Sequence, residues 1–468
     1  MTRQSVSQYL IFITVSLALF LAGIAGTSVA IALEPIRTSF GVSVVLVGWV
    51  IGIYQLALTA SMPVVGKISD VIGRKPTYVS CVGLFVAGSL GSALAPNIFV
   101  LIACRFVQAL GGGGFMPAAV GIVADEFPNS RQKAIGLFSS IFPIGQIVGP
   151  VLGGWLVGSF GWRAAFWFNV PVGLFVLVLA LSLLRVSSGR KKSIDLAGAV
   201  LLVACLSCVM CALSLMAYAE STPMWLLVGL LLTASVVIGV VFVRHESGVP
   251  DAIVDLEILK ERPFIAANLY NFIYGAGVVG IMSLIPMFAV AVYGISYLES
   301  GLILIPRAIG MFITSFTCSM LMMRWGYRWP IVFGTLLAIV SLLLLGLEPG
   351  SLKILGGDLS GIVILTLIML IMGLGVGLAA PASNNACIEL MPHRAATITG
   401  IRGMFRQAGG AVSITVATLV MQQMNDLAAG FQVVFIGLAI VMLATFPAIF
   451  MMPGSPGDMC LTGTREDR

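Results

Sequence analysis

The sequence predicts an all-α membrane protein with fourteen transmembrane helices. Of its 468 residues, 59% are hydrophobic and only 9% are charged, and the mean hydropathy is +1.08. A soluble protein cannot cover its surface with so few charges. Apolar runs of about 18 to 25 residues, each long enough to cross a hydrocarbon core about 30 Å thick, recur from one end of the chain to the other.

The apolar runs are separated by short polar segments, and each is expected to form one span. The first run is too long for the apolar part of a signal peptide, and only Arg3 precedes it, so we expect it to be retained. The expected spans are residues 9–33, 44–66, 77–95, 98–124, 134–158, 164–184, 196–218, 225–243, 264–290, 301–323, 330–346, 361–386, 397–421 and 431–452.

The distribution of Lys and Arg predicts the orientation, because cations that flank spans stay on the cytoplasmic side. With the N-terminus inside, 18 of the 25 Lys and Arg fall in inner segments. We therefore expect a multi-pass protein of the cell membrane with both termini in the cytoplasm. The net charge of +6 reflects this asymmetry, and we expect no nucleic-acid partner. The cations expected within spans are Arg105, Arg307, Arg402 and Arg406.

An internal repeat divides the chain into two related halves. A spacing of 264 residues relates Gly111 to Gly375, Gly113 to Gly377, Pro117 to Pro381, Pro128 to Pro392, Gly136 to Gly400 and Gly145 to Gly409. Earlier in each half the spacing is 253, as between Gly73 and Gly326. The expected domains are an N-terminal six-helix bundle (1–186), a linker with two additional helices (187–262), a C-terminal six-helix bundle (263–453) and a cytoplasmic tail (454–468).

Four motifs resemble those of one transporter family, and the resemblance covers most of the chain. They are GKISDVIGRKP (residues 66–76), RFVQALGGG (105–113), GQIVGPVLGG (145–154) and GWRAAFWFNVP (161–171). Together and in this order they resemble the major facilitator superfamily, specifically its drug:proton antiporter branch with fourteen spans. The resemblance implies two pseudo-symmetric six-helix bundles plus two inserted helices, and proton-coupled efflux of small organic compounds by alternating access.

The first motif predicts a conformational latch. Gly66 permits close approach of two helices and Gly73 a tight turn, while Asp70 can face the positive end of a helix. The resemblance implies that Asp70, followed by Arg74, latches the halves on the cytoplasmic side. The repeat places its partner at the start of the span at 397–421, with Arg394 as the side-chain candidate. Ordinary anchoring of a basic loop is the alternative.

The third motif predicts a tightly packed, bendable helix. Gly145, Gly149, Gly153 and Gly154 put small residues on nearly one helical face, and Pro150 weakens the backbone hydrogen bonds beside them. The resemblance implies that this antiporter motif seals the cavity.

Arg105 is the most informative single residue, because a guanidinium inside a span is costly without a partner or water. In relatives of this branch an Asp of the first span, shortly before a Thr, is tied to proton coupling. Here the residue two before Thr27 is Ala25, at much the same depth as Arg105. The remaining coupling candidates besides Arg105 are Glu34 and Asp125, which are expected at the mouths of the cavity.

None of the 19 acidic residues is expected in the middle of a span, whereas four arginines lie within spans. This balance disfavours a cavity for lipophilic cations. Arg307 is the first choice for a cargo contact. The candidate cargo-binding residues, for which simple helix–helix bonding is the alternative, are Tyr54, Gln55, Gln108, Gln146, Asn268, Asn271, Tyr274, Arg307, Asn384 and Arg406.

Three functions stay open at this point. The first is a proton-coupled exporter of drug-like compounds, and the second an exporter of an anionic or amphiphilic metabolite with different or no proton coupling. The third is a non-transporting membrane sensor on the same fold. No catalytic set or metal cluster is visible in the sequence, so we expect neither an enzyme nor a cofactor nor a metal. The expected partners are a small molecule, protons and the lipid bilayer, and the expected state is a monomer.

Overall fold

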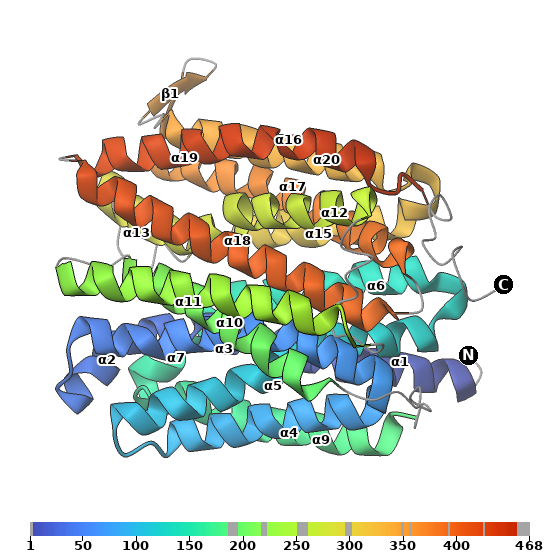
Figure 1. Cartoon of the computed structure of the whole chain (residues 1–468). Coiled ribbons are helices and arrows are strands. Elements are labelled where there is room, and N and C mark those ends of the chain that lie inside the picture. Colours follow the sequence, from blue (N-terminus) through green and yellow to red (C-terminus); the bar gives the residue numbers. More distant parts are fainter. Residues whose placement is uncertain are drawn as a thin grey trace. The chain divides into compact units, whose positions relative to one another are not determined.

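A computed structural model describes residues 3–185, 195–216, 222–249, 261–294, 302–347, 351–354, 357–391, 394–424 and 426–455. Regular structure in these residues is helical, apart from one two-stranded hairpin (Figure 1). Thirteen stretches are long and apolar enough to cross a membrane, and the apolar part of a fourteenth helix, Ala197–Leu213, is shorter. The predicted all-α membrane fold is confirmed.

The first six expected spans are built from nine α-helices. The first span breaks between α1 and α2 at Ser28, directly after Thr27, whose hydroxyl oxygen lies 3.2 Å from Gly23 O. The helices are α1 (Arg3–Thr27), α2 (Val29–Phe40), α3 (Val44–Ile72), α4 (Arg74–Ala93), α5 (Ile98–Glu126), α6 (Arg131–Ser139), α7 (Ile141–Phe160), α8 (Ala164–Trp167) and α9 (Asn169–Leu183), with a 3₁₀ turn, η1 (Pro128–Ser130).

The two inserted spans are α10 (Leu196–Met216) and α11 (Thr222–Glu246). Polar contacts join them at two levels. Cys205 Sγ lies 3.3 Å from Ser235 O, and His245 Nε2 lies 2.9 Å from both carboxylate oxygens of Asp195, just before α10. The two helices therefore form a pair.

The last six spans include a local change of helix type. The glycine-rich segment GAGVVG forms a π-helix, η3 (Gly275–Gly280), and such turns are rare and often lie at functional sites. The elements are α12 (Arg262–Tyr274), η3, α13 (Ile281–Tyr293), α15 (Ile305–Trp325), α16 (Arg328–Gly346), the antiparallel strands β1 (Ser351–Ile354) and β2 (Gly357–Ser360), α17 (Gly361–Leu390), α18 (Ala395–Gln423), α19 (Leu427–Leu443) and α20 (Thr445–Met451).

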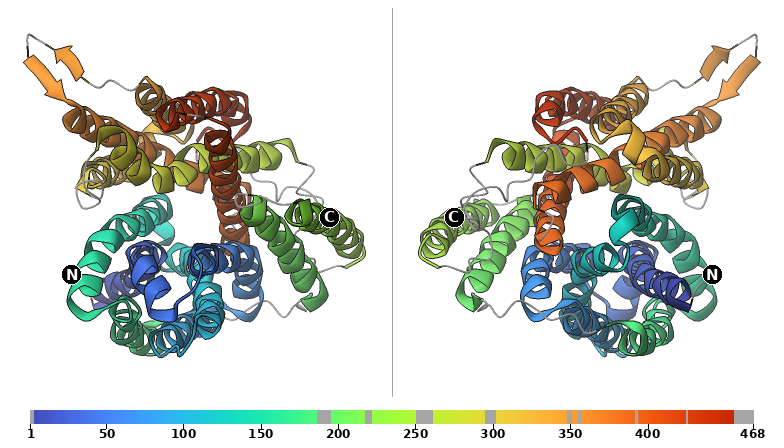
Figure 2. Two further views of the ribbon diagram at one scale, coloured as in Figure 1. Left: turned by 90° about the vertical axis from the view of Figure 1, so that its left-hand side faces the viewer. Right: turned by 90° about the vertical axis from the view of Figure 1, so that its right-hand side faces the viewer.

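The chain forms two compact units. Unit 1 comprises Met1–Ala212, Leu226–Glu257 and His393–Met404, and unit 2 comprises Leu213–Trp225, Ile258–Pro392 and Phe405–Arg468. Figure 2 shows the helices of α1 to α9, in blue to teal, running alongside one another as a bundle. The expected domain boundaries near 187 and 263 stay predictions. Residues 187–194, 217–221 and 250–260 of the expected linker and 456–468 of the expected tail lie outside the described residues.

The internal repeat is visible in how each unit packs. In unit 1, α5 packs against α3 through Gly113 and against α4 through Gly111. In unit 2, α17 packs against α15 through Gly377 and against α16 through Gly375. A side chain on any of these glycines would overlap the facing helix. The residues they face are again related by 253 positions: Leu58 and Met311, Ser61 and Thr314, Cys81 and Gly334, Phe85 and Ala338.

Candidate functional site

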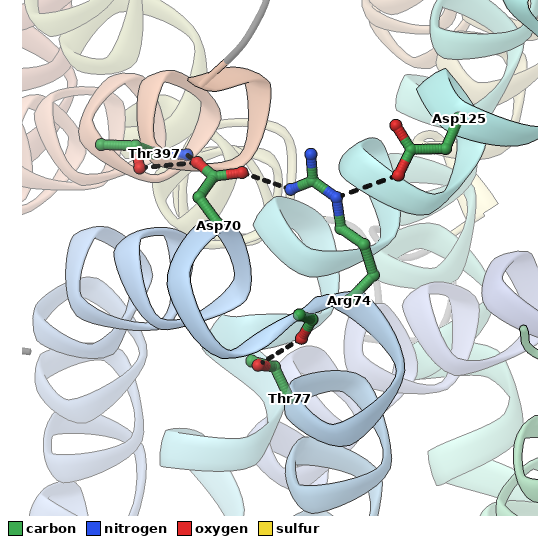
Figure 3. Close-up of polar contacts among 6 residues, drawn as sticks. Asp70, Arg74, Thr77, Asp125 and Thr397 are labelled. Carbon is green, nitrogen blue, oxygen red and sulfur yellow. Dashed lines mark hydrogen bonds and ion pairs between the residues drawn. The ribbon is translucent and has the colours of Figure 1, made fainter. Parts of the chain in front are cut away.

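The Asp70 carboxylate binds the first turn of α18 (Figure 3). Its Oδ2 accepts a hydrogen bond from the backbone N–H of Thr397 at 2.9 Å and another from the Thr397 hydroxyl at 2.7 Å. The first backbone N–H groups of a helix have no partner within the helix, and the dipole makes this end positive. Asp70 therefore caps α18 as an anion, at the span where a partner was expected.

Arg74 completes this cluster, since its guanidinium pairs with the other oxygen of Asp70. Arg74 Nε also donates to Asp125 Oδ2 at 3.2 Å (Figure 3). The turn before Arg74 is made by Gly73 at φ +119°, a conformation that L side chains rarely adopt. Gly121 of α5 leaves the space that the guanidinium fills. The motif thus places two carboxylates on one cation at the ends of α3 and α5.

Gly66 lets α3 and the start of α18 touch through their backbones. A Cβ at this position would lie 2.6 Å from Ala396 O and 3.0 Å from Thr397 Cα. Any side chain would therefore push the N-terminus of α18 away from Asp70. Arg394, the side chain that the sequence suggested as the partner, lies in the turn directly before α18.

The glycines of the third motif lie against α1, within unit 1. A Cβ on Gly145 would overlap the backbone at Phe20, and one on Gly153 would lie 2.8 Å from Ser28 O. Gly154 is looser, since its nearest contact is a flexible side-chain end at 3.6 Å. Gly145, Gly149 and Gly153 therefore form the close contact between α7 and α1.

Pro150 leaves one carbonyl of α7 without its usual donor, and α1 supplies a replacement. Proline has no N–H, so the carbonyl four residues earlier, at Gln146, loses its helical hydrogen bond. The Thr27 hydroxyl donates to Gln146 O at 2.9 Å. A hydroxyl from a neighbouring helix thereby satisfies a backbone oxygen that cannot bind water in the membrane.

Arg105 is fully buried in unit 1 and is bound by neutral groups alone. Its guanidinium donates to Gln108 Oε1 at 2.7 Å, to Val50 O at 3.1 Å and to Ala25 O at 3.3 Å. The guanidinium carbon also lies 3.9 Å from the centre of the Tyr54 ring, an attractive cation–π geometry. No described carboxylate contacts it.

The contact with Ala25 shows what the missing acid would have met. Ala25 is fully buried, and its own carbonyl oxygen is one of the three acceptors for Arg105. A carboxylate on this residue would be attached to the turn of α1 that the guanidinium already contacts. The chain carries a methyl group there, and the cation keeps neutral partners.

A second cluster of the expected residues forms in unit 2. Tyr274 stacks on Tyr270, with ring centres 5.4 Å apart, and the guanidinium carbon of Arg406 lies 5.8 Å from the Tyr274 ring centre. Arg307 on α15 is buried, and it interacts electrostatically with Tyr274 and Arg406. Arg406 of α18 thus lies over the ring of Tyr274 of α12, and Arg307 of α15 is within electrostatic reach of both.

The other amide candidates are placed less distinctively. Asn268 and Asn271 donate to carbonyls of their own helix, Phe264 O at 2.9 Å and Ala267 O at 2.7 Å. Asn384 is fully buried on α17. Gln55 is exposed and Gln146 half-buried. Within the described chain, neither glutamine side chain hydrogen-bonds to a member of either cluster.

Glu34 lies in α2, beyond the candidate span that ends at Thr27. Its side chain is 66% exposed and pairs with Arg37. Arg37 Nη2 donates to Glu34 Oε1 at 2.5 Å, and Arg37 Nε donates to Glu34 Oε2 at 2.8 Å. The hydrogen bonds from Arg37 lower the pKa of Glu34 below its ordinary value of 4.5. Asp125 is also exposed and pairs with Arg74. Asp125 therefore lies at the end of α5, and Glu34 lies within α2 outside the candidate span, each beside a cation.

Three residues of these clusters were not expected from the sequence. Thr397, the partner of Asp70, is the first residue of the expected span 397–421 and could have been found as a hydroxyl at the start of an expected helix. Tyr270 precedes Tyr274 by one helical turn, which is a visible signal. No local signal in the sequence pointed to Thr27, because its partner lies 119 residues away in the chain.

Comparison with known proteins identifies similar transporters. The model of the Major Facilitator Superfamily matches residues 15–414 and 267–459. The multidrug transporter protein MdtP of Bacillus subtilis (strain 168) is 32% identical over 412 residues, which cover 86% of this chain and 74% of that protein. Multidrug resistance protein 3 of the same organism is 29% identical, covering 89% and 80%. The solved structure of the proton:xylose symporter XylE shares the fold, with a TM-score of 0.68. It is 16% identical in sequence, and the match covers 96% of each chain.

Proposed function

Because the chain belongs to the major facilitator superfamily and is a multi-pass membrane transporter, we propose that it exports small drug-like organic compounds across the cell membrane. The direction and the cargo class are supported by its relatives, which are named for multidrug transport and resistance. We also propose that both termini lie in the cytoplasm, as the distribution of Lys and Arg favours, and that the protein acts as a monomer.

Our proposal for the cargo is based on the balance of charged residues in the spans. Arg105 and Arg307 are buried, whereas every described acid in a candidate span falls within the last three residues of its helix. A lipophilic cation would need a buried carboxylate to replace its hydration. We therefore place the cargo among neutral and anionic compounds.

The Asp70 contact supports an alternating-access cycle. The start of α18 belongs to unit 1 and the rest of this helix to unit 2, so a cap on its first turn acts on a helix that both units share. Releasing the cap exposes backbone N–H groups and a carboxylate that water can solvate. Such a contact can hold one state and still open at modest cost, which suits a latch.

We propose the proton gradient as the driving force, as the resemblance to drug:proton antiporters implies. In the part of the chain that the structure describes, no carboxylate lies in the middle of a span. We propose that the acid that exchanges the proton lies near a helix end, as Asp125 does.

Everted membrane vesicles from expressing cells provide the test, because an exporter loads its cargo into their lumen. The probes are carboxyfluorescein, which is anionic, and ethidium, which is a permanent cation. We expect vesicles with the wild-type protein to accumulate carboxyfluorescein, and vesicles with Asp70→Asn to accumulate much less. Accumulation of ethidium alone would refute the cargo charge, and accumulation of neither probe, nor of a neutral dye such as Nile red, would refute export.

A further inference from the structure

We propose that Arg307, Arg406 and Tyr274 of unit 2 form a binding site for the oxyanion of an aromatic cargo, such as an aryl carboxylate or aryl sulfonate. The inference rests on the proposed export function and names its cargo more closely. The two guanidinium groups would bind the oxyanion, and the stacked rings of Tyr270 and Tyr274 would contact the aromatic body.

The geometry brings these groups together from three helices. Arg406 of α18 lies over the Tyr274 ring at 5.8 Å, and Tyr274 of α12 stacks on Tyr270 with 26° between the ring planes. Arg307 of α15 is 4% exposed and interacts electrostatically with both Tyr274 and Arg406. Two like charges near one ring repel each other unless an anion lies between them.

The cluster lacks the groups that usually satisfy a buried guanidinium. Arg307 Nε is buried and has no hydrogen-bond partner among the described residues, and neither Arg307 nor Arg406 forms an ion pair with any of them. Arg105 of unit 1 also has one buried nitrogen without a partner among the described residues, its Nη2, but its other nitrogens donate to three acceptors. Because a buried cation without a counter-charge is costly, the unit 2 cluster favours an incoming anion.

The repeat indicates that Arg307 is not required by the shared packing. The 253-residue offset that relates Leu58 to Met311 and Ser61 to Thr314 also relates Tyr54 to Arg307. The equivalent position of unit 1 thus packs a neutral ring in the same kind of helix pair. Unit 2 thus carries a charge where unit 1 carries a tyrosine, and ligand binding is a reason for this difference.

The turn after Tyr274 fixes the ring close to Arg406. Gly275, the first residue of the π-helix, lies directly against the backbone of Arg406, so α12 and α18 touch at this level. Gly373 of α17 lies against the backbone of Arg307 in the same way. The backbones of both arginines are therefore held by close contacts with a neighbouring helix, which limits where their side chains can reach.

Equilibrium binding to the purified full-length protein in detergent tests the site, with 2-naphthoate, 2-naphthalenesulfonate and 2-naphthamide as probes. The three share one ring system, and only the amide is neutral. We expect the wild-type protein to bind both anions at least about tenfold more tightly than the amide. Arg307→Gln should abolish this preference, Arg307→Lys should keep part of it, and Arg324→Gln, an exposed position on the same helix, should leave it unchanged.

Thermal unfolding without a ligand separates binding from a structural role. If Arg307 awaits an anion, Arg307→Gln should unfold at the same or a higher temperature than wild type, and naphthoate should stabilise only the wild type. A variant that unfolds earlier in the absence of any probe would indicate a structural guanidinium and overturn the inference. Equal binding of all three probes by wild type, or binding of none, would also overturn it. These outcomes would not change the export of Nile red in vesicles, so they would leave the proposed export function intact.

Discussion

At the scale of single residues, two buried arginines of this protein differ in how they are bound. Arg105 donates three hydrogen bonds to carbonyl and amide oxygens and lies against a tyrosine ring, and only its Nη2 lacks a partner among the described residues. Arg307 has a buried nitrogen without a partner in the described chain. The first arrangement suits a fixed part of the structure, and the second suits a group that acquires its partner from outside.

Asp70→Asn is expected to loosen the first turn of α18. The substitution removes the charge that binds Thr397 and Arg74, and a hydrogen bond to a charged group contributes about 1.5 to 3 kcal/mol. Hydrogen exchange of the amides at the start of α18 should accelerate by about tenfold or more, since 1.4 kcal/mol corresponds to a factor of about ten. Asp125→Asn, which alters the exposed partner of the same Arg74, should leave this exchange unchanged. Equal acceleration in both variants would mean that the cap on α18 is not the important contact.

At the scale of helices, the contact between α1 and α7 depends on an irregularity in each helix. Pro150 frees the Gln146 carbonyl, and Thr27 both supplies the missing donor and lies where α1 is interrupted. The glycines beside them allow the approach that makes the hydrogen bond possible. A proline and a threonine from distant parts of the sequence therefore form one structural unit.

Thr27→Val is expected to destabilise this contact by about 1 kcal/mol, because the near-isosteric side chain cannot donate to Gln146 O and interhelical hydrogen bonds in membranes are worth about this much. Unfolding of the purified protein in mixtures of detergent and dodecyl sulfate measures the loss. Thr233→Val is the matched control, since that hydroxyl is exposed on α11 and donates only to its own helix, at Gly229 O. If both variants are equally stable, the bond to α7 contributes nothing.

The parts of this architecture that sequence could predict are those that depend on local pattern. Hydropathy identified the fourteen apolar helices, and the spacing of glycines gave a repeat whose register reappears in the packing, as Gly111 and Gly375 illustrate. Position in the repeat also led from Asp70 to the start of α18. The exact partner, Thr397, and the bond between Thr27 and Gln146 could not be predicted, because each joins groups more than a hundred residues apart.

At the scale of the whole molecule, the proposed proton coupling requires a titrating group, and no described carboxylate lies in the middle of a span. A coupling acid must gain and lose a proton within the working range of pH. Glu34 is held ionised by Arg37, which lowers its pKa below 4.5, and its contribution to folding stability is present above that ordinary value and lost only as pH falls through the lowered one. Glu34 therefore stays charged at physiological pH.

We therefore expect Glu34→Gln to export carboxyfluorescein with the same dependence on an imposed pH gradient as wild type, measured in everted vesicles between about pH 5.5 and about pH 8, where an ordinary glutamate is already ionised. Collapsing the gradient with a protonophore should slow export equally in both proteins, because the proton enters and leaves through another group. Asp70→Asn serves as the low-activity reference in the same vesicles. If Glu34→Gln alone makes export independent of the gradient, Glu34 exchanges the proton despite its pairing with Arg37, and the coupling site lies at the mouth formed by α2.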